Sequence, residues 1–411
     1  MKRPIVKYYS LSSVLALEPH MDKVIEDFCT HLDTRFIKGP DGPKDIDLGE
    51  WVAFCESFLC LLSLSYRPDP SYVVGWETYP TSVLDAWDLI SSVTFSHRFG
   101  YMDKGYDFDG TIATADKALD YFATVGQIPS LDFLLDKNPI MRIGPPNLSN
   151  ATRIALENLI ARLQGKDPHF DPKTSDFLQH FIDSKTENPD LVDDGVIMGY
   201  LLVNILAGAD TTAITIRAVF YYVLRDPDVY RKLVAEILAS DLDPERPAPY
   251  NTARALPYLE AVCREAMRLH PAVAMLLERY VPETGLTLPD GSFVPGGAAV
   301  GINPYVVGRN KGVWGPDADE FRPERWLRAK GEDEETYRLR LRQMNGADLT
   351  FGGGSRVCTG RNLATLEVYK VVATLVRRYD IQLADPTREW DVTCSWFPRQ
   401  EGIICKIQRR V

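Results

Sequence analysis

The spacing of apolar and polar residues predicts a chain built mostly of helices. Apolar residues recur at helical intervals in a series of segments, namely residues 10–37, 85–95, 111–135, 149–164, 174–185, 193–225, 226–240, 256–270 and 361–380. Residues 279–302 instead alternate short β-type runs with glycine and proline turns, and GIICKIQ near the C-terminus is a further strand. The pattern therefore predicts a mainly α fold with small β-sheets.

The segment 193–225 differs from the others because it is apolar on nearly every side. A helix of this kind is typical of the centre of a large protein, and a membrane span is the competing interpretation. Asn204, Asp210 and Arg217 interrupt the apolar run, which favours a central helix.

Composition limits the classes of protein that need to be considered. The 411 residues are 45% hydrophobic and 25% charged, and no shift in composition divides them, so we expect one globular domain over residues 1–411. A net charge of -11 without a basic block argues against nucleic acid as a partner. The seven cysteines form neither a zinc pattern nor an even disulfide framework, which favours a reducing compartment. The N-terminal sequence MKRPIVKYYSLSSV has no apolar run of the kind that a membrane anchor needs.

The chemistry is expected around Cys358, in the stretch FGGGSRVCTGRNLATLE. Three consecutive glycines precede this cysteine and allow a flat, bulky group to lie close to the backbone. A helix is predicted directly after Gly360, and the free N–H groups at a helix N-terminus favour a thiolate over a thiol. A thiolate in this position is a nucleophile or a metal ligand.

The fixed positions of this stretch resemble the haem-binding loop of the cytochrome P-450 superfamily, which is Phe, two variable residues, Gly, any, Arg, any, Cys, any, Gly. The match falls on Phe351, Gly354, Arg356, Cys358 and Gly360. The resemblance implies haem b as the cofactor, with Cys358 as the axial thiolate ligand of its iron, Phe351 packed beside the ligand and Arg356 on a propionate. A thiolate ligand favours O–O cleavage.

The central helix carries a second motif, Ala207-Gly208-Ala209-Asp210-Thr211-Thr212. We interpret Ala207 and Gly208 as leaving room for a ligand, and we expect the Thr211 hydroxyl to bond to the carbonyl four residues earlier. Asp210 and Thr211 are candidate catalytic residues that deliver protons to the reacting oxygen. A buried helix with a packing glycine is the alternative. The segment is similar to the oxygen-activation motif of the same superfamily.

Further residues match structural motifs of the superfamily. Glu265 and Arg268 are one helical turn apart and match its Glu-x-x-Arg motif, and FRPERW at 321–326 matches the partner segment. The resemblance implies that Arg325 joins Glu265 and Arg268 in a buried structural network behind the haem loop. Arg279 lies where members often bind a propionate; an ordinary exposed arginine is the alternative.

The resemblance implies a monooxygenase that inserts one oxygen atom from O2 into a small hydrophobic substrate, by hydroxylation or dealkylation, in secondary metabolism or detoxification. Electrons would come from NADPH through a reductase. We expect the reductase to dock on the Cys358 side, at positive charges supplied by Arg361, Lys370, Arg377 and Arg378.

The chain also departs from the superfamily pattern. It looks closest to fungal microsomal members of the pisatin demethylase type, which sit on the endoplasmic reticulum through an N-terminal anchor. The sequence given lacks that anchor and the first strands and helices, so a cytoplasmic location is an alternative, and residues 56–84 look like an insertion. Two other interpretations stay open: a non-catalytic remnant that binds haem weakly or not at all, and a hydrolase with Cys358 as nucleophile, for which no partner histidine is evident.

Overall fold

The structure is a computed structural model of the chain. It describes residues 2–39, 43–48, 51 and 84–410. The predicted insertion at 56–84 lies outside these residues except for Leu84. The described part is mainly helical with small antiparallel sheets, as the pattern of apolar residues predicts.

The predicted helix over residues 10–37 is divided in the structure. The chain forms η1 (Val6–Tyr9), α1 (Leu11–Leu15), α2 (Glu18–Leu32) and η2 (Asp33–Ile37). The Ser10 side chain caps the N-terminus of α1, and Pro19 lies in the first turn of α2, where its fixed φ and missing N–H favour a helix start. A single helix was therefore the wrong prediction for this segment.

A group of helices follows the segment that the structure does not describe. It comprises α4 (Leu84–Phe95), α5 (Tyr101–Lys104), α6 (Thr111–Gln127), α7 (Ser130–Leu135), α8 (Ser149–Leu163) and α9 (Phe177–Glu187). The predicted helix at 111–135 breaks at Ile128-Pro129, which separates α6 from α7.

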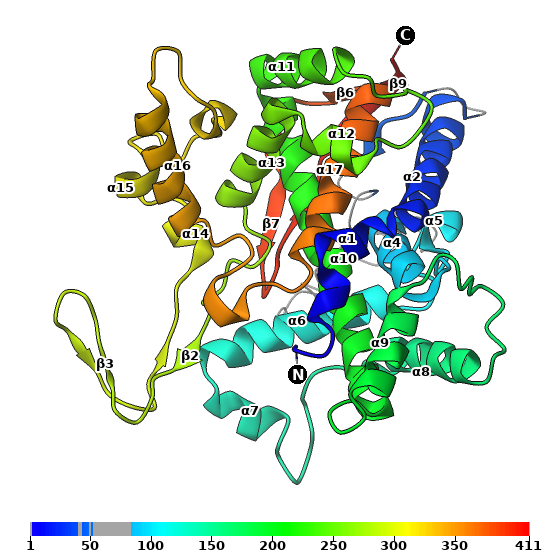
Figure 1. Cartoon of the computed structure of the whole chain (residues 1–411), viewed down its shortest axis with the longest axis vertical. Coiled ribbons are helices and arrows are strands. Elements are labelled where there is room, and N and C mark those ends of the chain that lie inside the picture. The colour runs from blue at the N-terminus through cyan, green and yellow to red at the C-terminus, as the bar shows by residue number, and fades with distance from the viewer. Residues whose placement is uncertain (1, 40–42, 49–50, 52–83, 411) are drawn as a thin grey trace, which may run out of the picture.

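Helix α10 (Asp194–Arg225) runs through the middle of the protein (Figure 1). The Asp193 side chain caps its N-terminus by accepting from the Val196 N–H at 2.8 Å. Helices α4, α8, α13 and α17 pack against it. Among the described residues, α10 is the one helix that is long and apolar enough to cross a membrane, but more than half of its apolar stretch is buried inside the protein, which is typical of a core helix.

The remaining helices surround α10 or form a lobe to one side. They are α11 (Pro227–Leu238), α12 (Tyr250–Arg254), α13 (Pro257–Leu269), α14 (Pro304–Val307), α15 (Lys311–Trp314), η3 (Pro323–Trp326), α16 (Glu334–Ala347), η4 (Gly354–Arg356) and α17 (Arg361–Arg378). Figure 1 shows α17 beside α10, and α14, α15 and α16 set apart on the left. A separate small cluster that includes Trp314, Trp326 and Met344 forms the core of this lobe.

The sheets are short and antiparallel. Strands β1 (Ile46–Asp47), β9 (Ile404–Arg409) and β6 (Tyr379–Leu383) form one sheet, with Ile46 opposite Cys405 and Tyr379 opposite Arg409. Three two-stranded pairs accompany it: β2 (Arg279–Tyr280) with β5 (Ala299–Val300), β3 (Leu286–Thr287) with β4 (Phe293–Val294), and β7 (Asp391–Cys394) with β8 (Pro398–Glu401). The predicted sheet at 279–302 and the predicted final strand are confirmed.

Candidate active site

The loop that carries Cys358 is held by its own backbone. The N–H of Cys358 donates to the carbonyl of Phe351 at 2.8 Å, and the N–H of Gly352 donates to the carbonyl of Leu349 at 2.9 Å. Gly352 and Gly354 have φ of 70° and 59°, which side-chain-bearing residues rarely adopt. The glycines are therefore required to turn the chain back, so that Phe351 and Cys358 lie at the two ends of one tight loop.

The loop is open on one side. A Cβ added at Gly354 would have no heavy atom within 4 Å, and one added at Gly352 would approach only the Leu277 side chain, at 3.9 Å, and the Arg356 carbonyl oxygen, at 4.0 Å. Cys358 is exposed, and Phe351 is partly buried against the main core. The backbone and the thiol thus offer the surface that a flat group needs. This observation fits the residues to a haem.

The Cys358 side chain reaches the surface, but neighbouring protein atoms still remove part of the water around its thiol. This partial desolvation raises the pKa of the thiol, while the N–H groups of Gly360 and Arg361 and the charges of Lys2 and Arg361 act in the opposite direction. The predicted effect of the helix N-terminus is therefore present but is outweighed by desolvation. A metal ion is the usual means of overcoming such a penalty, because it deprotonates a coordinating thiol.

Within the described residues, Cys358 belongs to no larger cluster of metal-ligating side chains. Among the described residues no three His, Cys, Asp or Glu side chains lie close enough together to hold a metal ion. A lone thiolate is compatible with a cofactor that brings the remaining ligands of its iron, as a haem does.

Central helix α10 presents a second open surface. Val203, Ala207 and Thr211 follow one another at intervals of four residues and so lie along one stripe. Val203 is 66% exposed, Ala207 is exposed and Thr211 is partly buried, although most of the helix around them is buried. The Thr211 hydroxyl donates to the Ala207 carbonyl at 2.8 Å, which confirms the predicted bond.

Gly208 lies on a different side of α10. A Cβ at this position would be 2.6 Å from Cδ1 and 2.9 Å from Cγ1 of Ile90 on α4. Close packing of α4 against α10 is therefore a sufficient reason for the glycine, in line with the alternative interpretation of the motif as a buried helix with a packing glycine. Its place beside a cofactor stays a prediction.

The Asp210 carboxylate is buried and accepts a hydrogen bond from Trp87 Nε1 at 3.1 Å. Burial raises its pKa to about 6, although this bond and the charges of Arg399 and Arg217 oppose the shift. A carboxyl group with a pKa near neutrality can both hold and release a proton. Sequence reasoning missed Trp87; the available signal was an aspartate in an apolar helix, which requires a buried donor.

Glu265 is the centre of a buried ionic network. Its carboxylate accepts from Arg268 Nε and Nη2 at 2.9 and 2.8 Å and from Arg325 Nε at 2.8 Å. Trp326 Nε1 and the Arg322 N–H donate to it at 2.9 and 3.0 Å. The structure thus brings Glu265, Arg268 and Arg325 together, as the resemblance implied.

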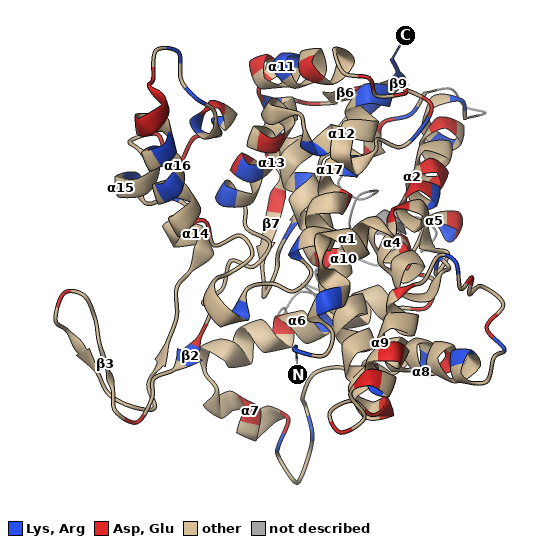
Figure 2. Ribbon diagram, in the orientation of Figure 1, with Lys and Arg blue, Asp and Glu red and all other residues tan. Residues whose placement is uncertain are grey.

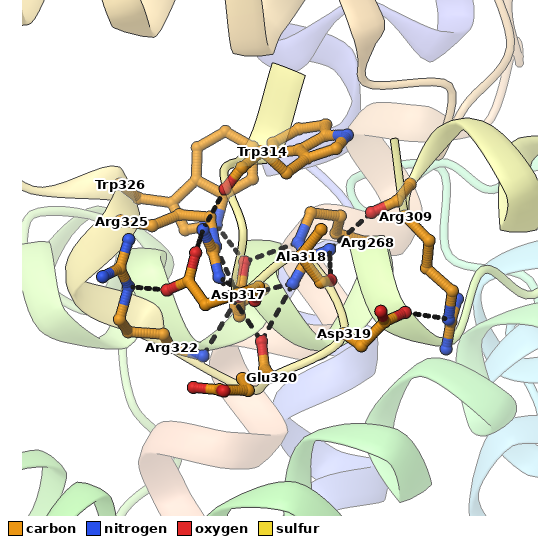
Figure 3. Close-up of polar contacts among 12 residues, drawn as sticks. Arg268, Arg309, Trp314, Asp317, Ala318, Asp319, Glu320, Arg322, Arg325 and Trp326 are labelled. Carbon is orange, nitrogen blue, oxygen red and sulfur yellow. Dashed lines mark hydrogen bonds and ion pairs between the residues drawn. The ribbon is translucent and has the colours of Figure 1, made fainter. Parts of the chain in front are cut away.

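Backbone carbonyls complete the network (Figure 3). Arg268 donates to the carbonyl of Ala318 at 2.6 Å, and Arg325 donates to the carbonyl of Asp317 at 2.9 Å. The network lies where α13 packs against η3. It therefore fixes the lobe of α14, α15 and α16 to the body of the protein.

The two candidate propionate ligands, Arg356 and Arg279, are both exposed. Arg356 ends the short helix η4, two residues before Cys358. Arg279 lies in β2, and its guanidinium donates to the carbonyl of its neighbour Glu278. Their role toward a cofactor stays a prediction.

The predicted docking charges on α17 require a correction. Lys370 is fully buried and donates to Glu18 and to the Ala248 carbonyl at 2.6 and 2.8 Å. Arg378 is buried and Arg377 is partly buried, and they donate to the carbonyls of Pro244 and Leu242. Figure 2 shows where charged residues lie on the ribbon. Of the four predicted residues, Arg361 alone is exposed.

Comparison with known proteins agrees with this site. Residues 84–407 match the family described as Cytochrome P-450. The chain belongs to this family, whose members bind haem iron through a thiolate.

Curated relatives extend the similarity to the whole chain. It is 47% identical over 410 residues to the cytochrome P-450 monooxygenase cfoH of Aspergillus candidus, covering 100% of this chain and 70% of that protein. It is 34% identical over 419 residues to the monooxygenase cicH of Emericella nidulans, covering 100% of this chain and 74% of that protein. The chain is thus a haem monooxygenase of the cytochrome P-450 family, and these relatives give no support to a non-catalytic remnant.

Proposed function

We propose that this monooxygenase inserts one oxygen atom from O2 into a small hydrophobic organic substrate, by hydroxylation or dealkylation, in secondary metabolism. The observation that carries the proposal is Cys358, an exposed thiol at the end of an open glycine loop that belongs to no cluster of three or more metal-ligating side chains in the described part of the chain. The names of the fungal relatives support the reaction class.

Haem b, when bound through Cys358, supplies the oxygen chemistry. The residues of the chain hold and orient it. We assign Phe351, Gly354 and Gly360 to the cradle around the ligand, and Arg356 and Arg279 to the propionates. Ala207 and Gly208 of α10 would be further residues that hold the haem.

Asp210 and Thr211 are the proposed proton-delivery pair. The Thr211 hydroxyl is held by the Ala207 carbonyl, and it adjoins Asp210, whose pKa of about 6 allows proton exchange near neutral pH. Glu265, Arg268 and Arg325 are structural and have no part in the proton transfer.

Electrons would come from NADPH through a reductase, as in the family generally. The corrected docking surface on the Cys358 side retains Arg361, which is exposed at the first position of α17. The proposal also includes association with the endoplasmic reticulum, because fungal members of the family are typically membrane-associated.

The test is the carbon monoxide difference spectrum of the purified, dithionite-reduced chain with haem supplied. We expect a strongly red-shifted Soret band for the wild-type protein and for Cys394→Ser, which removes another exposed thiol, and loss of the shift in Cys358→Ser. A wild-type protein without the band would contradict the proposal. Retention of the band in Cys358→Ser would show that Cys358 is not the ligand.

A further inference from the structure

Residues 2–10, here called the strap, lie against the start of α17. Lys2 Nζ donates to the Val357 carbonyl at 2.9 Å, next to Cys358. Further along the strap, the backbone carbonyl of Tyr9 accepts from Asn362 Nδ2 at 2.8 Å. Asn362 is four residues beyond Cys358, within the first turn of α17. The strap is therefore bonded on both sides of the cysteine.

The side chain of Tyr9 reaches the central helix. Its hydroxyl donates to Asn204 Oδ1 of α10 at 2.6 Å, and Asn204 Nδ2 donates in turn to Thr94 Oγ1 of α4 at 2.9 Å. Tyr9, Asn204 and Thr94 are 8%, 7% and 0% exposed. Water has little access to these groups, so each bond in this chain is costly to leave unmade.

The Tyr9 ring is also fixed. It stacks on Phe177 of α9, with ring centroids 4.6 Å apart and an interplanar angle of 26°. A ring held by stacking directs its hydroxyl to one place, because only two side-chain torsions set its position. Tyr9 is therefore a rigid link between α10 and the start of α17.

Both ends of this link lie close to the proposed cofactor surfaces. Asn204 precedes Ala207 by one turn of α10 and Thr211 by two turns. At the other end, the Tyr9 carbonyl accepts from Asn362, which lies one turn after the Cys358 loop. A flat cofactor held between Cys358 and the stripe on α10 requires a constant separation of these two surfaces.

We propose that Tyr9 is a positioning residue for the haem, and that its hydroxyl and carbonyl together set the separation between the Cys358 loop and α10. The inference rests on the proposed function, because it takes Cys358 as the iron ligand. Tyr9 itself contacts neither the reacting atoms nor, in this proposal, the substrate.

The test uses Tyr9→Phe, which removes one hydroxyl and keeps the stacked ring. Tyr8→Phe is the matched control: Tyr8 stands next to it on η1 and stacks on His180, and within the described residues its hydroxyl makes no hydrogen bond to α10 or to α17. Two quantities are measured, namely the rate of haem transfer to excess apomyoglobin and the fraction of the reduced carbon monoxide complex that has the red-shifted Soret band.

We expect Tyr9→Phe to lose haem about tenfold faster, the equivalent of one buried hydrogen bond, and to form a mixture of shifted and unshifted complexes. Tyr8→Phe should behave as the wild type. A purely structural bond would lower the melting temperature of the apoprotein without changing the spectral fraction in the cold. Wild-type haem loss and a fully shifted band in Tyr9→Phe would overturn the inference.

A second variant covers the case in which Tyr9→Phe folds poorly. Tyr9→Phe/Asn204→Leu/Thr94→Val replaces all three members of this hydrogen-bond chain by apolar groups, so that none of them is left as a buried unpaired group. Fast haem loss in this folded triple variant supports positioning by the bond, and wild-type haem retention overturns it. Failure of the wild-type protein to give the band would instead refute the proposed function, so the two failures are distinguishable.

Discussion

Replacement of Glu265 by glutamine tests the most highly coordinated group in the protein. The carboxylate is fully buried, and its two arginine partners are 2% exposed at their side chains. Oε1 accepts from Arg268 Nη2, Arg325 Nε and the Arg322 N–H, and Oε2 accepts from Arg268 Nε and Trp326 Nε1. An amide in either orientation turns a donor toward at least two buried donors.

The expected loss of stability follows from this geometry. Each buried donor without an acceptor costs about 1–3 kcal/mol, and the two guanidinium groups also lose their shared negative charge. Removal of one partner from a buried ion pair typically costs about 3–5 kcal/mol, and we expect Glu265→Gln to lower the free energy of unfolding by at least that amount. Urea unfolding followed by far-UV circular dichroism measures the change.

The matched control is Glu157→Gln on α8. Its partner Arg153 is one turn away, and the two side chains are 61% and 53% exposed, so the change should be below about 0.5 kcal/mol. If the free energy of unfolding of Glu265→Gln lies within about 1 kcal/mol of the wild-type value, the network does not fasten the lobe to the body and the reasoning is wrong.

Further substitutions on α10 test the interpretation of this helix. Gly208→Ala should destabilise the fold by about 1–3 kcal/mol, because the added Cβ clashes with Ile90. Its control, Gly199→Ala, has nothing within 4 Å of the added Cβ and should stabilise the fold by about 1 kcal/mol. Equal melting temperatures for the two variants would contradict this prediction. Because the pKa of Asp210 is raised to about 6, the folded state keeps a proton between about pH 4 and pH 6 that the unfolded state has lost. The free energy of unfolding should therefore fall as the pH rises through this range, by up to about 3 kcal/mol. In a series of unfolding curves at different pH, Asp210→Asn should reduce the slope of the free energy of unfolding against pH. It should not abolish the slope, because burial also raises the pKa of Asp88 to about 6. An unchanged slope would refute the assignment of the raised pKa to Asp210.

The parts of the site that were predictable from sequence are those in which local chemistry decides the structure. The spacing of Gly354, Cys358 and Gly360 specifies a turn followed by a helix, and the Thr211 bond to Ala207 joins groups one turn apart. Glu265, Arg268 and Arg325 were expected together because two short motifs share one physical requirement, a common acceptor for buried guanidinium groups.

The parts that sequence reasoning missed depend on distant partners. Lys370 looks like a surface charge on α17, but Glu18 on α2 and the Ala248 carbonyl surround its ammonium group. Lys370 lies within the otherwise mostly apolar run VYKVVATLV, which was the available sign that a lysine there could be buried. The sequence also does not reveal that Ile90 packs against Gly208.

The strap has a consequence for how the protein reaches its native state. Tyr9 and Asn362 are separated by 353 residues, and Lys2 and Val357 by 355. Closing a flexible loop of that length costs about 5 kcal/mol in chain entropy beyond a constant, so these contacts are unfavourable until the intervening helices have formed and shortened the path. The contacts between the strap and the Cys358 loop are thus completed late in folding, and a nascent chain that has not yet presented α17 cannot make them.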